Sequence, residues 1–471
     1  MSRTAIAWFR EDLRLHDNPA LDYALAHFDR VIPVYLHTPR EAGHWQPGAA
    51  SRWWLHHSLR ALDADLQQAG ARLLLRQGDS AQALLQALQR ETGATGVVWN
   101  RLYTPWAVAR DLRIQNALSG NGTTVHSFCA SLLFEPQSVR KDNGEPYRVF
   151  TAFWKRCQAQ SLYQTLCEAP DRINAGTLPE GIALDQLGLL PVTRWDSGFS
   201  AYWTPGEHGA HAQASLFLDQ AIADYEQNRD IPAAPGTSHL SPHLHFGEIS
   251  PRALMNRAVQ RLDEIGSAAA RQSVTRFMAE LGWREFAAHI LYHYPASCDE
   301  SMDARFAQFP WAAADAAALQ RWQQGNTGIP IIDAGMRELW HTGWMHNRVR
   351  MLVASFLTKN LRIHWRQGAR WFWDTLVDAD LASNSLGWQW VTGCGTDAAP
   401  YFRIFNPVLQ GKKFDPDGEY VQRWVPELRA LEGKYLHEPW KAAGRYDYPA
   451  PMIDLRVSRE QALAAFRTLR G

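Results

Sequence analysis

The amino-acid sequence predicts an α/β protein: an N-terminal Rossmann-like domain with a parallel sheet, a long connector, and an all-helical C-terminal domain. Three observations support this. Short apolar runs alternate with helical patterns up to about residue 130, periodicity is weak from 131 to about 200, and helical patterns with capping signals dominate afterwards. Because 471 residues are too many for one hydrophobic core, we expect domains at 1–130, 131–200 and 201–471.

The N-terminal domain is predicted from its alternation of strands and helices. Amphipathic spacing predicts a helix at 51–68, and Thr104 followed by Pro105 is typical of the start of another. Strands separated by helices favour a parallel sheet covered on both faces. No glycine-rich nucleotide motif follows the first strand, so we read no dinucleotide site here. The expected strands are 5–9, 31–36, 71–76, 96–100 and 123–128.

The remaining segments have less regular patterns. We expect the connector to carry a polar tract at 141–148 and one helix near 149–164. In the C-terminal domain, helices are predicted at 271–293, after Gly343, and at 370–380. An extended segment around Trp388 and Trp390 would place both indoles on one face.

Bulk composition excludes several classes of protein. The 48 basic and 48 acidic side chains balance, so any nucleic-acid contact must come from a local basic patch. The five cysteines are scattered without a C-x-x-C motif, which is typical of a reducing cytosol and excludes a disulfide framework or zinc site. No signal peptide or apolar span is visible, so we expect a cytoplasmic protein without membrane contact.

The stretch at 378–407 is suited to holding a flat aromatic cofactor. Asp378 and Asp380 stand two residues apart, so on a helix they cannot form a facing acid/base pair. The Asn384 amide both donates and accepts hydrogen bonds, so it suits a ring nitrogen in either protonation state. Trp388 and Trp390 follow closely. The stretch holds no nucleophile beside a base and no set of metal ligands.

Other stretches carry weaker signals. The segment 237–241 precedes a helical pattern, where hydroxyl groups and free N–H groups favour a phosphate, although such a turn is more often a simple cap. Glu280, Trp283 and Arg284 share one face of the helix at 271–293, where a solvated ion pair is the ordinary interpretation. His243 and His245 lack a third ligand, so we predict no metal.

Four motifs resemble those of the photolyase/cryptochrome family, and the resemblance extends over nearly the whole chain, to HEPW at 437–440. It is most similar to the class I bacterial DNA photolyases that act on cyclobutane pyrimidine dimers. This resemblance implies a monomeric deoxyribodipyrimidine photo-lyase that repairs ultraviolet-damaged DNA by electron transfer from excited, reduced FAD to a flipped-out dimer. The motifs are WFREDLRLHDN (8–18), GTSHLSPHLHFGEISPR (236–252), TGWMHNRVRM (342–351) and DADLASNSLGWQWVTGCGTDAAPYFRIFNP (378–407).

The resemblance also implies roles for individual residues. Glu280 and Asn384 would act in catalysis, and Trp388, Trp365 and Trp311 would relay electrons to the flavin. The implied FAD-binding residues are Tyr225, Thr237, Ser238, His239, Leu240, Ser241, Phe277, Arg350, Asp378, Ala379, Asp380 and Asn384. The implied residues for substrate and DNA are Arg229, Glu280, Trp283, Arg284, Asn347, Arg348, Met351, Trp390, Arg403 and Gln410, with Lys413 on the same basic rim.

An antenna chromophore is also implied, either methenyltetrahydrofolate or a deazaflavin or flavin. The chain departs from the folate-binding pattern at Ala107 and Asp299, where a glutamate and a lysine are expected. Two alternatives within the family stay open: a signalling cryptochrome, and a photolyase for (6-4) photoproducts in which His346 would lie near the lesion. A general flavin oxidoreductase is less well supported, since no nicotinamide site is visible.

Overall fold

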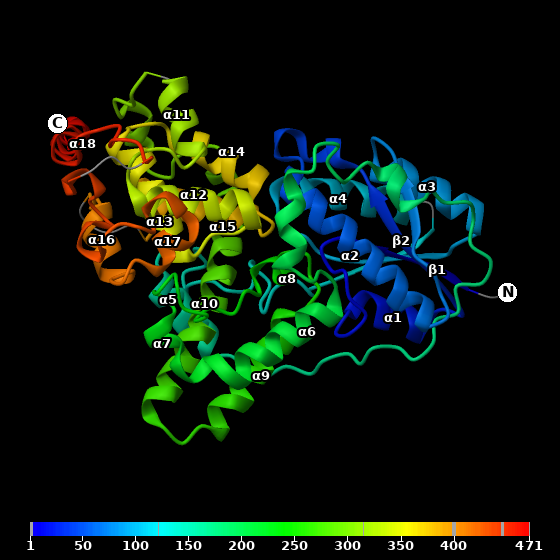
Figure 1. Cartoon of the computed structure of the whole chain (residues 1–471). Coiled ribbons are helices and arrows are strands. Elements are labelled where there is room, and N and C mark those ends of the chain that lie inside the picture. Colours follow the sequence, from blue (N-terminus) through cyan, green and yellow to red (C-terminus); the bar gives the residue numbers. More distant parts are fainter. Residues whose placement is uncertain (1–2, 121, 314, 398–401, 444–446, 471) are drawn as a thin grey trace. The chain divides into compact units, whose positions relative to one another are not determined.

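The computed structural model describes residues 3–120, 122–313, 315–397, 402–443 and 447–470, so residues 398–401 of the predicted cofactor stretch lie outside it. The chain divides into two compact units (Figure 1). Unit 1 comprises residues 1–194, 203–220 and 238–295, and unit 2 comprises 195–202, 221–237 and 296–471. This division differs from the predicted domain limits at 130 and 200, which stay predictions, because several helices after residue 203 pack with the N-terminal sheet unit.

The sheet of unit 1 is parallel, as predicted. In the described residues its strand order is β3-β2-β1-β4-β5, and β1 pairs with β2 (Ala5 with Val31) and with β4 (Trp8 with Trp99). The strand predicted at 71–76 begins later because the N–H of Leu73 donates to the Asp63 carboxylate instead of to a neighbouring strand. The strands are β1 (Thr4–Phe9), β2 (Arg30–His37), β3 (Leu74–Gln77), β4 (Gly96–Asn100) and β5 (Thr124–Phe128).

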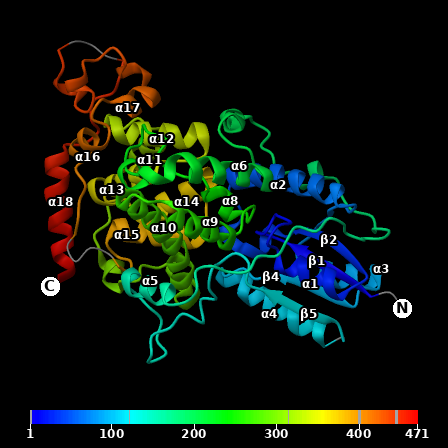
Figure 2. The same ribbon diagram turned by 90° about the horizontal axis from the view of Figure 1, so that it is seen from below.

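Helices surround this sheet and extend unit 1; Figure 2 shows α4 running beside β5. The helix expected after Thr104 begins at Pro105, and the predicted connector helix is shorter than 149–164, ending at Gln158. The helices are α1 (Pro19–His27), α2 (Ala49–Gln68), α3 (Ala81–Thr92), α4 (Pro105–Ser119), α5 (Phe150–Gln158), α6 (Glu207–Leu216), α8 (Ser241–His245), α9 (Pro251–Glu264) and α10 (Ala268–His293).

The motif at 8–18 is largely a structural network at the end of β1. Arg10 forms an ion pair with Asp111 at 2.6 Å, and the Asn100 amide donates to Asp12 at 2.6 Å. Each of these four side chains is buried, so their pairing removes the cost of burying polar groups. The network therefore fastens the end of β1 to β4 and α4.

Unit 2 is mostly helical and has its own apolar core around Trp322, Trp365, Trp388 and Tyr420. Its helices are α7 (Tyr225–Asn228), α11 (Ala316–Gln323), α12 (Pro330–Thr342), α13 (Asn347–Ser355), α14 (Trp365–Thr375), α15 (Leu381–Thr392), α16 (Pro407–Phe414), α17 (Glu419–Trp424) and α18 (Leu455–Arg467). Across the described residues, no helix combines the length and apolar character needed to cross a bilayer.

Two local predictions in unit 2 were wrong. The helix expected at 370–380 ends at Thr375, because Val377 donates its N–H to the Gly343 carbonyl at 2.8 Å and leads the chain away from α14. A new helix, α15, then begins at Leu381, and the preceding Asp380 caps it by accepting the Ser383 N–H at 2.7 Å. Trp388 and Trp390 consequently lie on this helix and not on an extended segment.

Candidate functional site

A buried ion pair joins α13 to the segment before α15. The Arg350 guanidinium donates to the Asp378 carboxylate at 2.8 Å and to the Met345 carbonyl at 2.7 Å. The Asp378 side chain is only 3% exposed, so its charge requires such a partner. The His346 side chain caps the start of α13 by accepting the Arg348 N–H, which sets the position of Arg350 one turn later. The structure therefore brings together two of the residues predicted to bind the cofactor.

The first turn of α15 holds the remaining predicted cofactor residues of this stretch. Asp380 caps the helix, so its carboxylate has a structural role, and Ala379 is buried. The Asn384 side chain donates from Nδ2 to the Ala369 carbonyl of α14 at 3.0 Å. This bond orients the Asn384 amide through its nitrogen. The bond to Ala369 does not involve the amide oxygen, which is a hydrogen-bond acceptor.

The three tryptophans of the predicted relay all belong to unit 2. Trp388 and Trp365 are buried, whereas Trp311 is half-buried. Trp388 packs against Gly368 of α14, where a Cβ atom would lie only 2.0 Å from its ring, so glycine permits the close approach. Trp365 is three residues earlier on the same helix and donates its indole N–H to Ser301 at 3.1 Å.

Between Trp365 and Trp311 lies a histidine that sequence reasoning missed. The His364 ring centroid is 4.7 Å from that of Trp311 and 5.8 Å from that of Trp365. Burial, and to a lesser degree the nearby Arg366, lowers the pKa of His364 to about 4. A neutral imidazole therefore lies between the two indoles at neutral pH. In the sequence, the only sign of this role was the position of His364 directly before Trp365.

Three predicted basic residues gather at one place in unit 2. Arg348 pairs with Asp230 at 2.5 Å, and Arg229 lies 3.9 Å from the same carboxylate. The Arg348 guanidinium and the Lys413 ammonium lie over the Phe414 ring, 4.4 and 4.9 Å from its centre. Among the described contacts of this cluster, the Asp230 carboxylate faces two of the three cations, Arg348 and Arg229.

The other predicted DNA residues of unit 2 have varied environments. Asn347 and Arg403 are exposed, and Arg403 lies over the Phe405 ring at 4.8 Å. Gln410 and Met351 are half-buried. Trp390 donates its indole N–H to the Asp397 carbonyl at 3.0 Å, so its ring is fixed by the segment that follows α15.

In unit 1, the predicted substrate residues lie on α10. The Glu280 side chain is 27% exposed and lies 3.6 Å from Arg276 one turn earlier. Trp283, three residues later, stacks on Phe150 with ring centroids 3.8 Å apart and planes 10° apart. Phe150 begins α5 within the predicted connector, and its role was not visible in the sequence because only the fold brings it to Trp283. The stack holds the indole plane rigidly beside the carboxylate.

Arg284 differs from its neighbours on α10. Its guanidinium donates to the carbonyls of Ser131 at 2.6 Å and Leu244 at 3.3 Å, within unit 1. Phe277 is buried against Phe217, with ring centroids 4.8 Å apart. Arg284 thus has a clear structural task in addition to its predicted contact with DNA.

The predicted phosphate-binding segment is divided in sequence between the two units, after residue 237. Ser238 to Ser241 belong to unit 1, where the Gln213 amide holds the Ser238 carbonyl at 2.9 Å. His239 adopts a left-handed backbone conformation with φ of 52°, and Leu240 directly behind it is buried. Thr237 and Tyr225 belong to unit 2, where Tyr225 is buried below the Arg229 guanidinium.

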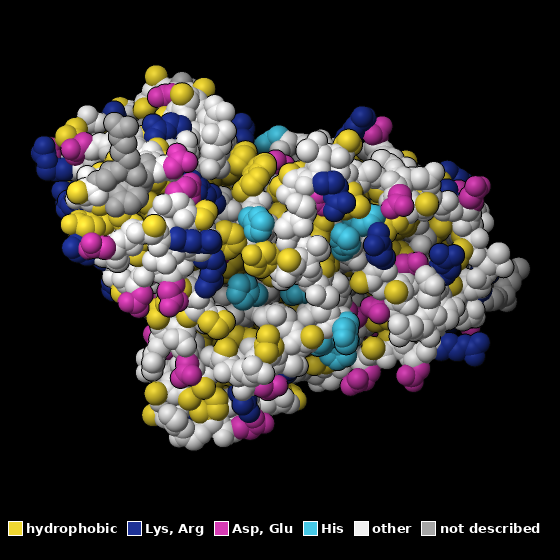
Figure 3. Space-filling model, viewed as in Figure 1, with side chains coloured by type: hydrophobic (Ala, Val, Ile, Leu, Met, Phe, Trp, Pro, Cys, Tyr) yellow, Lys and Arg dark blue, Asp and Glu magenta, His cyan; other side chains and the backbone are white. Residues whose placement is uncertain are grey.

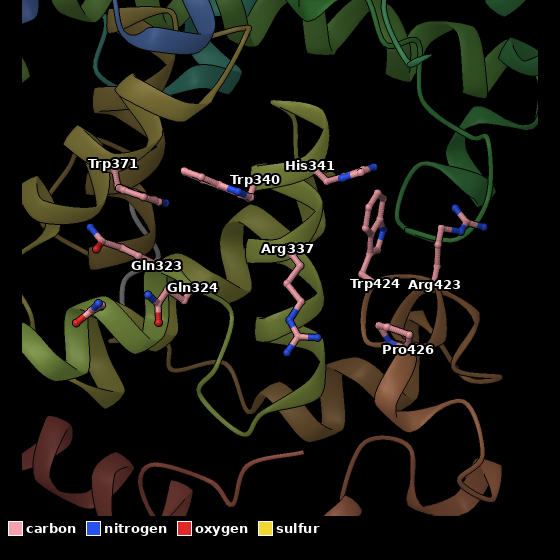
Figure 4. A pocket seen from close by; sticks show the side chains of 10 residues that line it. Gln323, Gln324, Arg337, Trp340, His341, Trp371, Arg423, Trp424 and Pro426 are labelled. Atoms are coloured by element: carbon pink, nitrogen blue, oxygen red, sulfur yellow. The ribbon is translucent and has the colours of Figure 1, made fainter. Parts of the chain in front are cut away.

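Unit 2 also contains a cavity of about 830 Å³ lined by none of the predicted site residues (Figure 4). Trp340 and Trp371 stack at one end, 5.9 Å apart, and Arg337 reaches out to Glu427 at 2.8 Å. The lining residues are Gln320, Gln323, Gln324, Arg337, Trp340, His341, Trp371, Arg423, Trp424 and Pro426.

Comparison with known proteins decides the family. A model described as DNA photolyase matches residues 5–171, and one described as the FAD binding domain of DNA photolyase matches residues 277–468. A deoxyribodipyrimidine photo-lyase of Agrobacterium fabrum is 47% identical over 99% of this chain and 98% of its own length. This chain belongs to the photolyase/cryptochrome family.

Two further relatives define its place within the family. Cryptochrome-1 of Arabidopsis thaliana is 39% identical over 96% of this chain and 68% of that protein. The crystal structure of a bacterial class III photolyase from Agrobacterium tumefaciens superposes with a TM-score of 0.95 at 46% identity, covering 100% of this chain and 98% of that one. The predicted assignment to class I is therefore not supported.

Family membership confirms three sequence-based expectations: the fold of a parallel-sheet domain with a helical remainder, an enzyme of the photo-lyase type, and FAD as cofactor. The roles of individual residues stay predictions. Basic and acidic side chains are interspersed on the face seen in Figure 3, in keeping with the balanced charge of the chain. A nucleic-acid contact on a chain of balanced charge needs a local group of basic side chains.

Proposed function

We propose that this chain repairs cyclobutane pyrimidine dimers in ultraviolet-damaged DNA under light. The observation that carries this proposal is the α10 face, where the Glu280 carboxylate stands partly exposed beside the indole of Trp283. A flat indole backed by Phe150 offers a stacking surface for a pyrimidine pair. The carboxyl group one turn away offers a hydrogen-bonding partner for the edge of the bases.

The residues of unit 2 fit a bound flavin. Asp378 is held by Arg350 as a buried, oriented carboxylate, and the Asn384 amide is oriented by Ala369. An amide suits a ring nitrogen of the flavin because it does not change its own charge. When bound, FAD supplies the light-excited electron that the dimer receives and later returns. The further contacts that we propose for FAD come from Tyr225, Thr237, Ser238, His239, Leu240, Ser241, Phe277, Ala379 and Asp380.

The tryptophans Trp388, Trp365 and Trp311 are proposed to deliver electrons when the flavin is oxidised. Their order of exposure supports this, because the two inner indoles are buried and Trp311 is half-buried. A positive charge that moves along this series reaches a residue in contact with solvent. The neutral His364 between Trp365 and Trp311 adds no opposing charge to that path.

For DNA, we propose that the cations around Phe414 contact phosphates and carry no sequence information. Asn347, Met351, Trp390, Arg403 and Gln410 are the further candidates for contact with the lesion strand. Flipping the damaged pair out of the duplex is a property carried over from photolyases, in which weakened stacking lowers its cost. A cytoplasmic location, a monomeric state and a bound antenna chromophore also remain predictions.

A signalling cryptochrome is the second candidate, and its support is the 39% identity with cryptochrome-1. The two functions separate in one experiment. Purified protein is examined for a flavin absorption spectrum, chemically reduced, and illuminated with oligonucleotides that carry either a cyclobutane dimer or a (6-4) photoproduct. We expect restored thymines only from the cyclobutane dimer. Repair of the (6-4) lesion alone would contradict the proposed substrate assignment. Repair of neither lesion by flavin-loaded protein would favour a signalling function.

A further inference from the structure

Three side chains of types that bind metals meet in unit 1, on the side of α6 that faces the loop after β1. They are His16 from that loop, and Glu207 and His211 from α6, all half-buried. Their ligand atoms lie within 4.8 Å of one another, and Glu207 Oε1 is 3.7 Å from His211 Nε2. None of the three has a part in the proposed repair reaction.

The local fold explains this meeting of residues far apart in the chain. Glu207 is the first residue of α6, and His211 follows one turn later, so both side chains lie on the same helix face. The Glu207 carboxylate accepts the backbone N–H of Leu15 at 2.6 Å through one oxygen and that of His16 at 2.9 Å through the other. These bonds hold the loop against α6, and the rings of His16 and His211 stand edge to face, 5.7 Å apart.

This set of ligands suits zinc or a similar divalent transition metal. Two imidazoles and one carboxylate with an open fourth position form a known ligand set for Zn²⁺, whereas Ca²⁺ and Mg²⁺ prefer oxygen ligands alone. Ligands about 2.0–2.1 Å from a tetrahedral ion lie roughly 3.4 Å from each other. The Glu207–His211 separation of 3.7 Å already approaches that value. Rotation of the two half-exposed imidazoles would shorten the remaining distances between ligand atoms, which are at most 4.8 Å.

The surroundings also favour a cation. Backbone donors hold the Glu207 carboxylate in place, as the outer hydrogen bonds of metal sites commonly do. The Asp65 carboxylate lies within electrostatic range of Glu207, so two carboxylates share this region. Arg14 is a nearby cation in electrostatic contact with Glu207, and its hydrogen bonds go to main-chain carbonyls, including that of Gly247 at 2.8 Å.

We propose that His16, Glu207 and His211 form a Zn²⁺ site that fastens the loop after β1 to the start of α6. The simpler alternative is that Glu207 only anchors the loop and that the histidines lie beside it without binding metal. Both interpretations keep the backbone hydrogen bonds to Glu207, which do not depend on the imidazoles. They differ in whether the imidazoles of His16 and His211 add affinity for a metal.

The test uses the full-length, untagged, flavin-loaded protein after treatment with a chelator. Titration with Zn²⁺ alone, followed by calorimetry, should show one tight site, and thermal unfolding should shift upward with added Zn²⁺. His16→Ala and His211→Ala should each weaken that site about tenfold or more. His208→Ala is the matched control, because His208 is exposed on the same helix and belongs to no such cluster among the described residues.

Cobalt provides a second measurement. Co²⁺ bound by the wild-type chain should give the visible absorption bands of a tetrahedral site, and His211→Ala should lose them. Circular dichroism of each variant identifies any that fail to fold. If His16→Ala fails to fold, the zinc and cobalt measurements on His211→Ala alone test the proposed site. Unchanged zinc affinity in His211→Ala, or equal losses in His208→Ala, would overturn the proposal.

Discussion

The two groups of predicted site residues hold their charges in different ways. On the unit 2 side, Asp378 is 3% exposed and accepts a 2.8 Å bond from Arg350. On the α10 side in unit 1, the Glu280 side chain is 27% exposed and lies 3.6 Å from an Arg276 that is itself 45% exposed. The first arrangement is fixed before any ligand arrives, as a permanent cofactor requires. The second remains adjustable, as suits a surface that meets a large, transient substrate.

The largest effect should come from breaking the buried pair. Asp378→Ala leaves the Arg350 guanidinium, whose side chain is only 24% exposed, without its ion-pair partner, so we expect loss of most bound FAD and about 3 kcal/mol less stability. The flavin-to-protein absorbance ratio and urea unfolding measure the two losses. Asp303→Ala is the control, because Asp303 pairs with exposed Arg305 in the same unit. Full flavin content in Asp378→Ala would show that the Asp378–Arg350 pair is not required to hold the cofactor, contrary to the difference proposed between this pair and Glu280.

Next in size is the loss of photoreduction. Trp388→Phe removes the inner member of the proposed relay but keeps an aromatic ring beside Gly368, so FAD should remain bound. We expect oxidised FAD to lose most of its reduction by light, while repair by chemically reduced enzyme continues. Trp322→Phe is the control, since Trp322 is equally buried and only 6.3 Å from Trp388. Equal losses in both variants would indicate a packing effect and not a relay.

A change on the α10 side should alter repair and spare the flavin. Glu280→Gln keeps the shape of the side chain and removes its charge, so the rate of dimer splitting should fall about tenfold, the value of one charge-assisted hydrogen bond. Flavin content should stay unchanged. Arg276→Gln should have a much smaller effect if Arg276 is only a surface partner. A Glu280→Gln variant with reduced flavin content would show that the two sides are not separate in function.

The last prediction concerns stability alone, through pH and the support of α13. Burial raises the pKa of Glu338 to about 7, even though Tyr420 and the His346 N–H donate to its carboxylate. Because the folded pKa exceeds that of the unfolded chain, this group favours folding most below about pH 4.5 and loses that contribution as pH rises through 7. Glu338→Gln should therefore gain up to about 3 kcal/mol in stability at pH 8 relative to pH 5. A pH-independent difference in urea unfolding would contradict the raised pKa.

Much of this molecule could be predicted from local patterns. The parallel sheet follows from apolar runs separated by helical ones, and the helix at 271–293 buries Val274, Phe277, Met278, Leu281 and Ile290 as its spacing indicates. Where local patterns misled, capping decided the outcome. Asp380 was predicted as the last residue of one helix but caps the start of the next one, and periodicity alone cannot tell a buried helix from an extended segment.

The sequence by itself determined the fold class, the family and the residue types available for a flavin and a damaged base. Only the tertiary structure decided which of them meet. Phe150 lies behind Trp283, His364 lies between two tryptophans, and His16 lies beside an acid 191 positions further along the chain. Periodicity and spacing report contacts within a few turns, whereas these contacts depend on how distant segments pack, which no local pattern encodes.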